Sequence, residues 1–287
     1  MASDSQLEIS FRYIFFAPHF TKFCICSTLE LMLNFYSKLK DVFYNLGFFA
    51  RTLKGVGYFV RHSHASFKIL VMQILFTFVH AMGISTLLAV AIGAAVNVVG
   101  TPMLAQFSQE QLIYSILITM IIRELGPLLT AFIVIARSAT AIATEVAGMV
   151  ISHEVEAYIS VGVDPIQHLA VPRFLAVTIS LVLLNIYFAV FGLVGSYLVA
   201  QLFGSMPMEY YFTNLLQNLK IQDILIMLLK SIACGAIISM VAVIQGFSVE
   251  RATTEVPVAG LKAVGSAFAS VIVVNILLSA LYYLVMT

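Results

Sequence analysis

The chain has 287 residues, of which 61% are hydrophobic and only 10% are charged, and its net charge is +1. Soluble domains carry about 25% charged residues, so this composition and the mean hydropathy of +1.02 exclude an ordinary soluble protein. The near-neutral charge and the lack of a basic tract give no indication of nucleic-acid binding. Five apolar runs, each long enough to cross a bilayer, predict a single all-α membrane domain.

The amino-terminal region, residues 1–66, precedes these runs. Between residues 29 and 53, apolar side chains recur at helical spacing, and basic residues such as Lys38, Lys40 and Arg51 lie on the other face. The pattern predicts an amphipathic helix in the headgroup region, with its basic side chains toward anionic lipid. A soluble helix docked on the protein is the alternative.

Residues 67–287 contain the five predicted spans. These cover approximately residues 67–99, 111–149, 165–203, 221–245 and 258–286. Several exceed the roughly 20 residues that a bilayer requires, so they should tilt, bend or protrude. The loop 204–222 is rich in Tyr and Phe, which predicts an anchor at the outer membrane interface.

The distribution of Lys and Arg predicts the orientation of the chain. An amino terminus in the cytoplasm places most of the basic residues on that side: Arg51, Lys54, Arg61, Lys68, Arg137, Arg173, Arg251 and Lys262. The opposite side then receives Lys220 and Lys230. The positive-inside rule therefore predicts a cytoplasmic amino terminus and an external carboxyl terminus.

Charged residues interrupt the second and fourth spans. Arg123 and Glu124 precede Gly126 and Pro127, and Lys230 lies within the fourth span. Pro127 has no N–H, so the Arg123 carbonyl loses its helical partner and the helix should bend, while Gly126 permits a close approach. A charge at mid-membrane costs at least ~2.5 kcal/mol, so such residues face a bundle interior or a wet cavity. The three charges predict a pocket for an anionic lipid headgroup; a structural Glu124–Lys230 ion pair is the alternative.

A short polar segment, residues 151–163, separates the second and third spans. Its apolar residues, Tyr158 among them, share one helical face, while Glu154 and Glu156 lie elsewhere and Asp164 can cap the next helix. The pattern predicts a short amphipathic helix, which is either a solvated connector or a docking element for a soluble partner. Charged residues of the adjoining helix ends are expected to cluster around it: Arg137, Glu145, Glu154, Glu156, Asp164 and Arg173.

Motifs for catalysis are missing from the sequence. It contains no GxxxxGK[ST] loop, no HExxH and no GxSxG, and Cys24, Cys26 and Cys234 lack the spacing of a zinc or redox site. These absences favour a non-catalytic protein without a metal site, so transport against a gradient would need energy from another chain. A proton-coupled secondary transporter that uses Glu124 is the main alternative, although the spans show no evident inverted repeat; an intramembrane lipid enzyme is a third.

Three stretches of the sequence resemble the MlaE family of permeases, the membrane subunits of lipid-moving ABC transporters. They are RELGP at residues 123–127, ARSATAIATEVAGM at 136–149 and EVEAYISVGVDPIQHLAVPRF at 154–174. The resemblance extends from residue 67 to the end of the chain. The loop 246–262 departs from the family pattern, because its RATT sequence at residues 251–254 is out of register.

The resemblance implies a fold and a set of partners. It implies an interfacial amino-terminal helix, five transmembrane helices and a homodimer enclosing an outward-facing lipid cavity in the bacterial inner membrane. It also implies a cytoplasmic ABC ATPase, which binds ATP and Mg, and a periplasmic MCE-domain protein. The implied function is phospholipid transport between inner and outer membranes, which maintains outer-membrane lipid asymmetry, with no cofactor in this chain.

The resemblance also assigns residues to roles. The implied lipid-cavity residues are Arg123, Glu124 and Lys230. The implied ATPase-coupling residues are Glu154, Glu156, Asp164 and Arg173, to which the charge pattern and the short helix add Arg137, Glu145 and Tyr158.

Overall fold

A computed structural model of the chain describes residues 47–57, 64–107, 112–203, 207–250 and 252–286. Residues 1–51 and 52–287 form two separate compact units, and all five long helical segments belong to the second. Every regular element within the described residues is a helix, so the predicted all-α class is confirmed. Residues 29–46 of the amphipathic helix predicted at residues 29–53 lie outside the described residues. Residues 47–57 are helical.

Five helical segments are long and apolar enough to cross a membrane, as predicted. The first is α3 (His64–Ala105), and the second is a continuous series of α4 (Leu112–Leu117), η1 (Ile118–Leu125), α5 (Gly126–Val134), η2 (Ile135–Ala139) and α6 (Thr140–Ile151). The short α7 (Glu154–Ser160) leads to the third segment, η3 (Ile166–Ala170) with α8 (Val171–Phe203). After α9 (Met208–Asn218) follow α10 (Ile221–Phe247) and α11 (Glu255–Met286).

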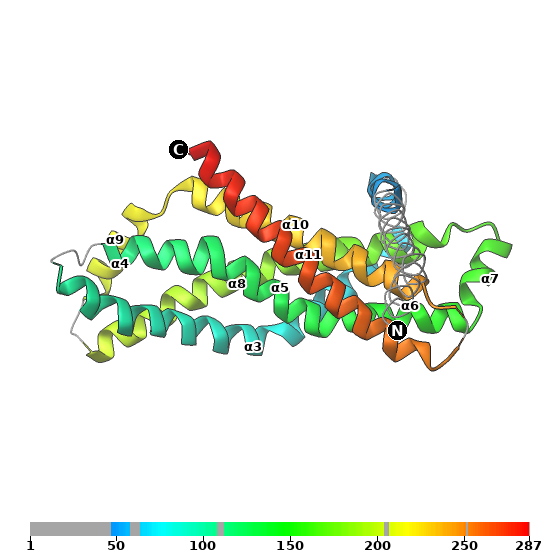
Figure 1. Cartoon of the computed structure of the whole chain (residues 1–287), viewed down its shortest axis with the longest axis horizontal. Coiled ribbons are helices and arrows are strands. Elements are labelled where there is room, and N and C mark those ends of the chain that lie inside the picture. Colours follow the sequence, from blue (N-terminus) through cyan, green and yellow to red (C-terminus); the bar gives the residue numbers. More distant parts are fainter. Residues whose placement is uncertain (1–46, 58–63, 108–111, 204–206, 251, 287) are drawn as a thin grey trace, which may run out of the picture. The chain divides into compact units, whose positions relative to one another are not determined.

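The long helices of the second unit lie side by side, with α10 in contact with most of the others. Helix α3 packs along α8, and α10 packs against α5, α6, α8 and α11. Figure 1 places α7 at one end of these helices and α4 with α9 at the other; we call these the α7 end and the α9 end. The most apolar window of α10 is 56% buried, whereas that of α11 is only 11% buried, so α11 leaves most of its apolar surface uncovered in the single chain.

The contact between α3 and α8 depends on small residues. A Cβ atom at Gly93 of α3 would lie 2.1 Å from the carbonyl oxygen of Gly192 in α8, and one at Gly195 would lie 2.7 Å from the α3 backbone. Side chains cannot fit at these positions, and their absence lets the two backbones approach closely in lipid. Beside them, the Asn97 amide donates to the backbone oxygen of Ser196 at 3.1 Å.

Helix α9 packs part of its aromatic surface inward. Tyr211 is buried, and its ring lies 5.6 Å from that of Tyr114 and 5.4 Å from that of Tyr197. Burial raises the pKa of the Tyr211 hydroxyl above its ordinary value. Met208 and Tyr210 are exposed on the same helix. The buried aromatic residues of this loop therefore contribute to packing, and only the exposed ones are available to anchor at an interface.

Two Gly→Ala changes in α3 test the close packing against α8. Gly93→Ala should lower the free energy of unfolding by about 2 kcal/mol, since the new methyl group meets backbone that cannot move aside. Gly83 is the matched control: it has no neighbour within 4 Å, so Gly83→Ala should stabilise the helix by up to about 1 kcal/mol. Unfolding of both variants in detergent, followed by circular dichroism, measures the difference. Equal stability of the two variants would contradict the packing argument.

Candidate functional site

The second span changes its helical geometry just before Pro127. Residues Ile118–Leu125 form a π-helix, and α5 begins at Gly126 with Pro127 in its first turn. A missing N–H is tolerated at the start of a helical segment. The backbone stays helical at Gly126, with φ of −53° and ψ of −63°. The span thus continues through the proline, and the wider π turns direct Arg123 and Glu124 differently from a regular helix.

Gly126 allows a polar side chain of α8 to reach the second span. A Cβ at Gly126 would lie 2.4 Å from the Ile121 carbonyl oxygen and 2.8 Å from Asn185 Oδ1. The other side of the Asn185 amide donates to Ser231 Oγ of α10 at 2.6 Å. The close approach predicted at Gly126 is therefore made by a side chain, which links α8 to α10 at the level of the charged residues.

Lys230 is the centre of a hydrogen-bonded ion network. Its Nζ donates to Glu124 Oε2 at 2.9 Å, to the Arg123 carbonyl oxygen at 2.8 Å and to Ser279 Oγ at 2.7 Å. Ser279 Oγ in turn donates to Glu124 Oε2 at 2.8 Å. An ammonium group has three donors, so these bonds account for all of them. The Arg123 carbonyl oxygen therefore accepts a bond from a charged donor.

The exposure of the network is uneven. The Lys230 side chain is 0% exposed, whereas that of Glu124 is 28% exposed. The ion pair between Glu124 and Lys230, which the sequence left open as a structural alternative, is present. In the single chain, Lys230 touches no open space, and Glu124 is the member of the pair that an approaching ligand can reach.

Arg123 occupies a second polar position next to the network. Its Nη1 lies 3.5 Å from Asp223 Oδ1, and its guanidinium carbon lies 4.4 Å and 5.0 Å from the ring centroids of Tyr282 and Tyr283. Among the described residues, its buried Nε and Nη2 have no hydrogen-bond partner. Arg123 therefore holds unused donors while its charge is balanced by one carboxylate and two aromatic faces.

Sequence reasoning missed several members of this site. Asp223 is visible as an acid in the first turn of the fourth span, where its Oδ2 also accepts from the Lys220 N–H at 3.2 Å. Ser279 and the Tyr282–Tyr283 pair give no comparable signal, because nothing in the fifth span indicates which face meets the second span. Their positions come only from the packing of α11 against α10 and α5.

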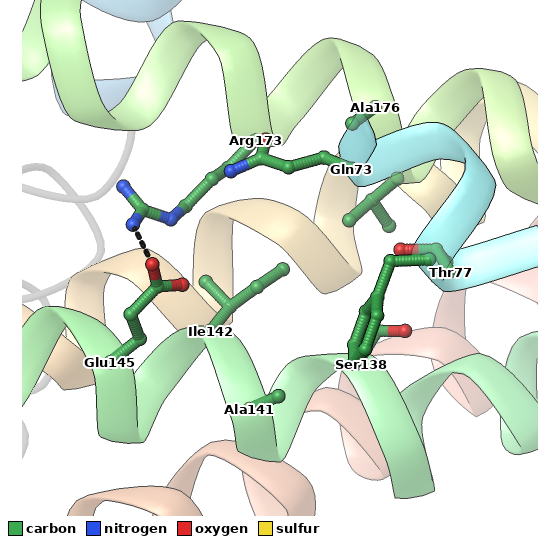
Figure 2. A pocket seen from close by; sticks show the side chains of 10 residues that line it. Gln73, Thr77, Ser138, Ala141, Ile142, Glu145, Arg173 and Ala176 are labelled. Atoms are coloured by element: carbon green, nitrogen blue, oxygen red, sulfur yellow. Dashed lines mark ion pairs between the residues drawn. The ribbon is translucent and has the colours of Figure 1, made fainter. Parts of the chain in front are cut away.

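At the α7 end, Glu145 and Arg173 join α6 to α8. Their closest atoms, Glu145 Oε1 and Arg173 Nη2, are 2.9 Å apart, and the side chains are 52% and 5% exposed. Arg173 Nη1 also donates to the Leu169 carbonyl oxygen at 2.9 Å. Figure 2 shows the guanidinium turned toward the Glu145 carboxylate at the edge of a small recess.

The remaining charged residues expected around the short helix are distributed among local contacts. Arg137 donates to the His80 carbonyl oxygen of α3, and Glu156 contacts His153 at 3.0 Å. Asp164 Oδ1 accepts from the Ile166 N–H at 3.0 Å, which is the helix cap predicted from the sequence. The expectation that Arg137 contributes to a cluster at the short helix is not met, because its side chain reaches α3.

Two more residues assigned to this region also make short-range contacts. Glu154 Oε1 accepts a bond from Ser152 Oγ at 3.2 Å. The Tyr158 ring lies 5.2 Å from the ring of His168 in η3. Tyr158 therefore connects α7 to the start of the third span.

Helix α7 is short and has no buried residue. Its flanks are turns with left-handed backbone, at His153 (φ 60°) and Gly162 (φ 81°), and glycine is the residue that adopts this geometry most readily. Ile159 and Val161 are exposed, the latter to 80%. Residues 154–160 of the segment 151–163 are helical, and Ile159 in this helix and Val161 directly after it present uncovered apolar side chains.

The charged residues between the helices and the short exposed helix between the second and third spans characterise a multi-pass membrane protein. A model of the family described as Permease MlaE matches residues 70–281. The chain belongs to this family.

Relatives of this chain occur in bacteria and in a plant. A probable ABC transporter permease of Rickettsia typhi is 28% identical over 216 residues, which cover 75% of this chain and 83% of the relative. The intermembrane phospholipid transport system permease MlaE of Haemophilus influenzae is 26% identical over 63% of this chain and 70% of its own. The chloroplast protein trigalactosyldiacylglycerol 1 of Arabidopsis thaliana is 26% identical over 68% of this chain and 54% of its own.

A double-mutant cycle tests the Glu124–Lys230 pair. Lys230→Met should lower the free energy of unfolding by about 3 kcal/mol, since it leaves a partly buried carboxylate without its counter-charge. Combining it with Glu124→Gln should recover at least about 1 kcal/mol, because the amide does not need that charge. Unfolding of the four proteins in detergent gives the coupling energy. Additive effects of the two changes would show that the pair does not act as a unit.

Proposed function

We propose that this protein is the permease subunit of an ATP-driven transporter that moves phospholipid between the inner and outer membranes and so maintains outer-membrane lipid asymmetry. Membership of the MlaE family and the similarity to the intermembrane phospholipid transport permease of Haemophilus support this proposal. The observation that carries it is the ion network inside the bundle, where Arg123 holds unpartnered donors and Glu124 remains partly exposed.

In this proposal, Arg123, Glu124 and Lys230 form the polar end of a lipid cavity. The phosphate of a lipid is a good acceptor for the free Nε and Nη2 donors of Arg123. Lys230, fully buried, holds Glu124 in place and does not touch the lipid itself. A second copy of the chain completes the cavity as a homodimer, and the uncovered apolar surface of α11 is consistent with such a contact.

The energy comes from another chain in this proposal. A cytoplasmic ABC ATPase, which binds ATP and Mg, docks on α7 through the exposed Ile159 and Val161. Movement of α7 then reaches α8 through Tyr158 and His168, and α6 moves with α8 because Glu145 and Arg173 join them. The charges of Glu154 and Glu156 on α7 offer the ATPase polar contacts at the rim.

The proposed location is the bacterial inner membrane, with the amino terminus and the α7 end in the cytoplasm. The α9 end and the carboxyl terminus then face the periplasm, where an MCE-domain protein would receive or deliver lipid. The excess of Lys and Arg on the predicted cytoplasmic side supports this orientation.

Variants of the ion network test the proposed lipid cavity. Arg123→Ala should reduce lipid transfer at least about tenfold, in line with the loss of a charge-assisted bond to the lipid phosphate. Glu124→Gln should have an effect of similar size, because it removes the counter-charge that orders Lys230 and the network. The ATPase should still co-purify, because neither residue lies near α7. Transfer of labelled phospholipid from vesicles containing the assembled complex measures the effect, and Glu209→Gln on the exposed surface of α9 is the control. Normal transfer by both variants refutes the cavity assignment.

The same vesicles distinguish the proton-coupled alternative. Lipid transfer that needs ATP and the partner ATPase supports the ABC transporter. Uptake by the isolated protein, driven by a pH gradient and abolished by Glu124→Gln, supports a secondary transporter instead.

Substitutions in the exposed apolar surface of α7 test the docking of the ATPase. Val161→Asp and Ile159→Asp should each reduce co-purification of the ATPase at least about tenfold, since a buried unpaired charge weakens an interface strongly. Met208→Asp is the matched control, because Met208 is an equally exposed apolar residue at the α9 end. Unchanged co-purification with both α7 variants would place the ATPase elsewhere.

A further inference from the structure

A recess lies between α3, α6 and α8 at the α7 end, away from the ion network around Lys230. Its polar lining is Gln73 and Thr77 of α3, Ser138, Glu145 and Arg173 (Figure 2). The recess measures about 370 Å³ when its open mouth is included. The proposed transport function assigns no ligand to it.

Two buried polar atoms in this recess have no partner among the described residues. One is a donor, Arg173 Nε, on a side chain that is only 5% exposed; the other is an acceptor, Gln73 Oε1. Figure 2 shows Gln73 reaching from α3 toward Arg173. Buried donors and acceptors in folded proteins nearly always have hydrogen-bond partners. The two unpartnered atoms therefore indicate that a bound molecule supplies the missing bonds. A ligand that satisfies both must accept a bond at one point and donate one at another.

The recess lies near one end of its three spans, where lipid headgroups are expected when the spans cross a bilayer. Gln73, Glu145 and Arg173 are each within seven residues of the nearest end of their span, at Leu70, Ile151 and Ile166. At 1.5 Å per residue, this places them no more than roughly 10 Å from the ends of their apolar spans. Phe76, which lines the recess, and Val79 are exposed at helical spacing along α3, and they offer an apolar surface for an acyl chain.

We propose that the recess binds the headgroup of a phospholipid that carries a primary ammonium group. Arg173 Nε donates to the phosphate, and the ammonium donates to Gln73 Oε1 and to the Glu145 carboxylate. Glu145 is half exposed and can turn toward the ammonium without leaving a buried charge. A zwitterionic headgroup matches the Arg173–Glu145 pair charge for charge, so the occupied site stays neutral.

The chemistry of the site discriminates among headgroups. Phosphatidylcholine has a quaternary ammonium with no N–H, so it cannot donate to Gln73. Phosphatidylglycerol carries no positive charge for Glu145. The site should therefore prefer phosphatidylethanolamine over both, and this preference does not depend on the direction of transport or on the ATPase.

Native mass spectrometry of the purified full-length protein tests the proposal. The protein is exchanged into mixed micelles that contain dioleoyl forms of the three lipids in equal amounts, and the bound lipids are counted per chain. We expect at least a fivefold preference for phosphatidylethanolamine. Ala141→Phe, which fills the recess, should remove this bound lipid, and Gln73→Leu should reduce the preference over phosphatidylcholine at least threefold.

Control variants separate this site from the proposed transport cavity. Ala91→Phe places the same bulk on an exposed position of α3, and Glu124→Gln alters the ion network; both should retain the lipid. Equal retention of the three lipids by the unmodified protein overturns the proposal. So does retention of phosphatidylethanolamine by Ala141→Phe, or its loss in Glu124→Gln alone, which would assign the lipid to the transport cavity.

Discussion

The buried ammonium of Lys230 is the interaction on which the rest of the bundle depends. A charge with no exposed surface is tolerated in an apolar environment only if every donor finds an acceptor. Its three acceptors come from the second and fifth spans, while Lys230 itself belongs to the fourth. The need to satisfy one side chain therefore fixes three helices relative to each other, and removal of any acceptor affects all of them.

The backbone of the second span is adapted to this requirement. The span continues through Pro127, and the Arg123 carbonyl oxygen accepts a bond from Lys230. Gly126 makes room for Asn185, which bonds to Ser231 one residue after Lys230. The π-helical turns of η1 carry Arg123 and Glu124. In the Arg-Glu-Leu-Gly-Pro sequence, the backbone geometry therefore determines where the charged side chains of Arg123 and Glu124 lie.

Two polar regions lie at different positions along the long helices. The network around Lys230 lies in the half that includes the α9 end, where Arg123 also meets Asp223 in the first turn of α10. The Glu145–Arg173 pair lies at the α7 end, where it connects helices on either side of the short exposed helix. Between them α3 contacts α8 through closely packed glycines, and hydrogen bonds from Asn97 to Ser196 and between Thr86 and Tyr187 support this contact.

The membrane class, the five spans and the cap at Asp164 could be predicted from the sequence alone, because hydrophobic length and helix capping are local properties. It also identified Arg123, Glu124 and Lys230 as charges in need of partners. The partners themselves are seen only in the tertiary structure, because Ser279, Asp223 and the Tyr282–Tyr283 pair come from distant helices. Residues 29–46 lie outside the described residues. The Arg137 side chain, predicted to lie near the short helix, instead donates to the His80 carbonyl oxygen of α3. The physical reason is that the rotation of each helix is set by packing against its neighbours, which a run of apolar residues does not encode.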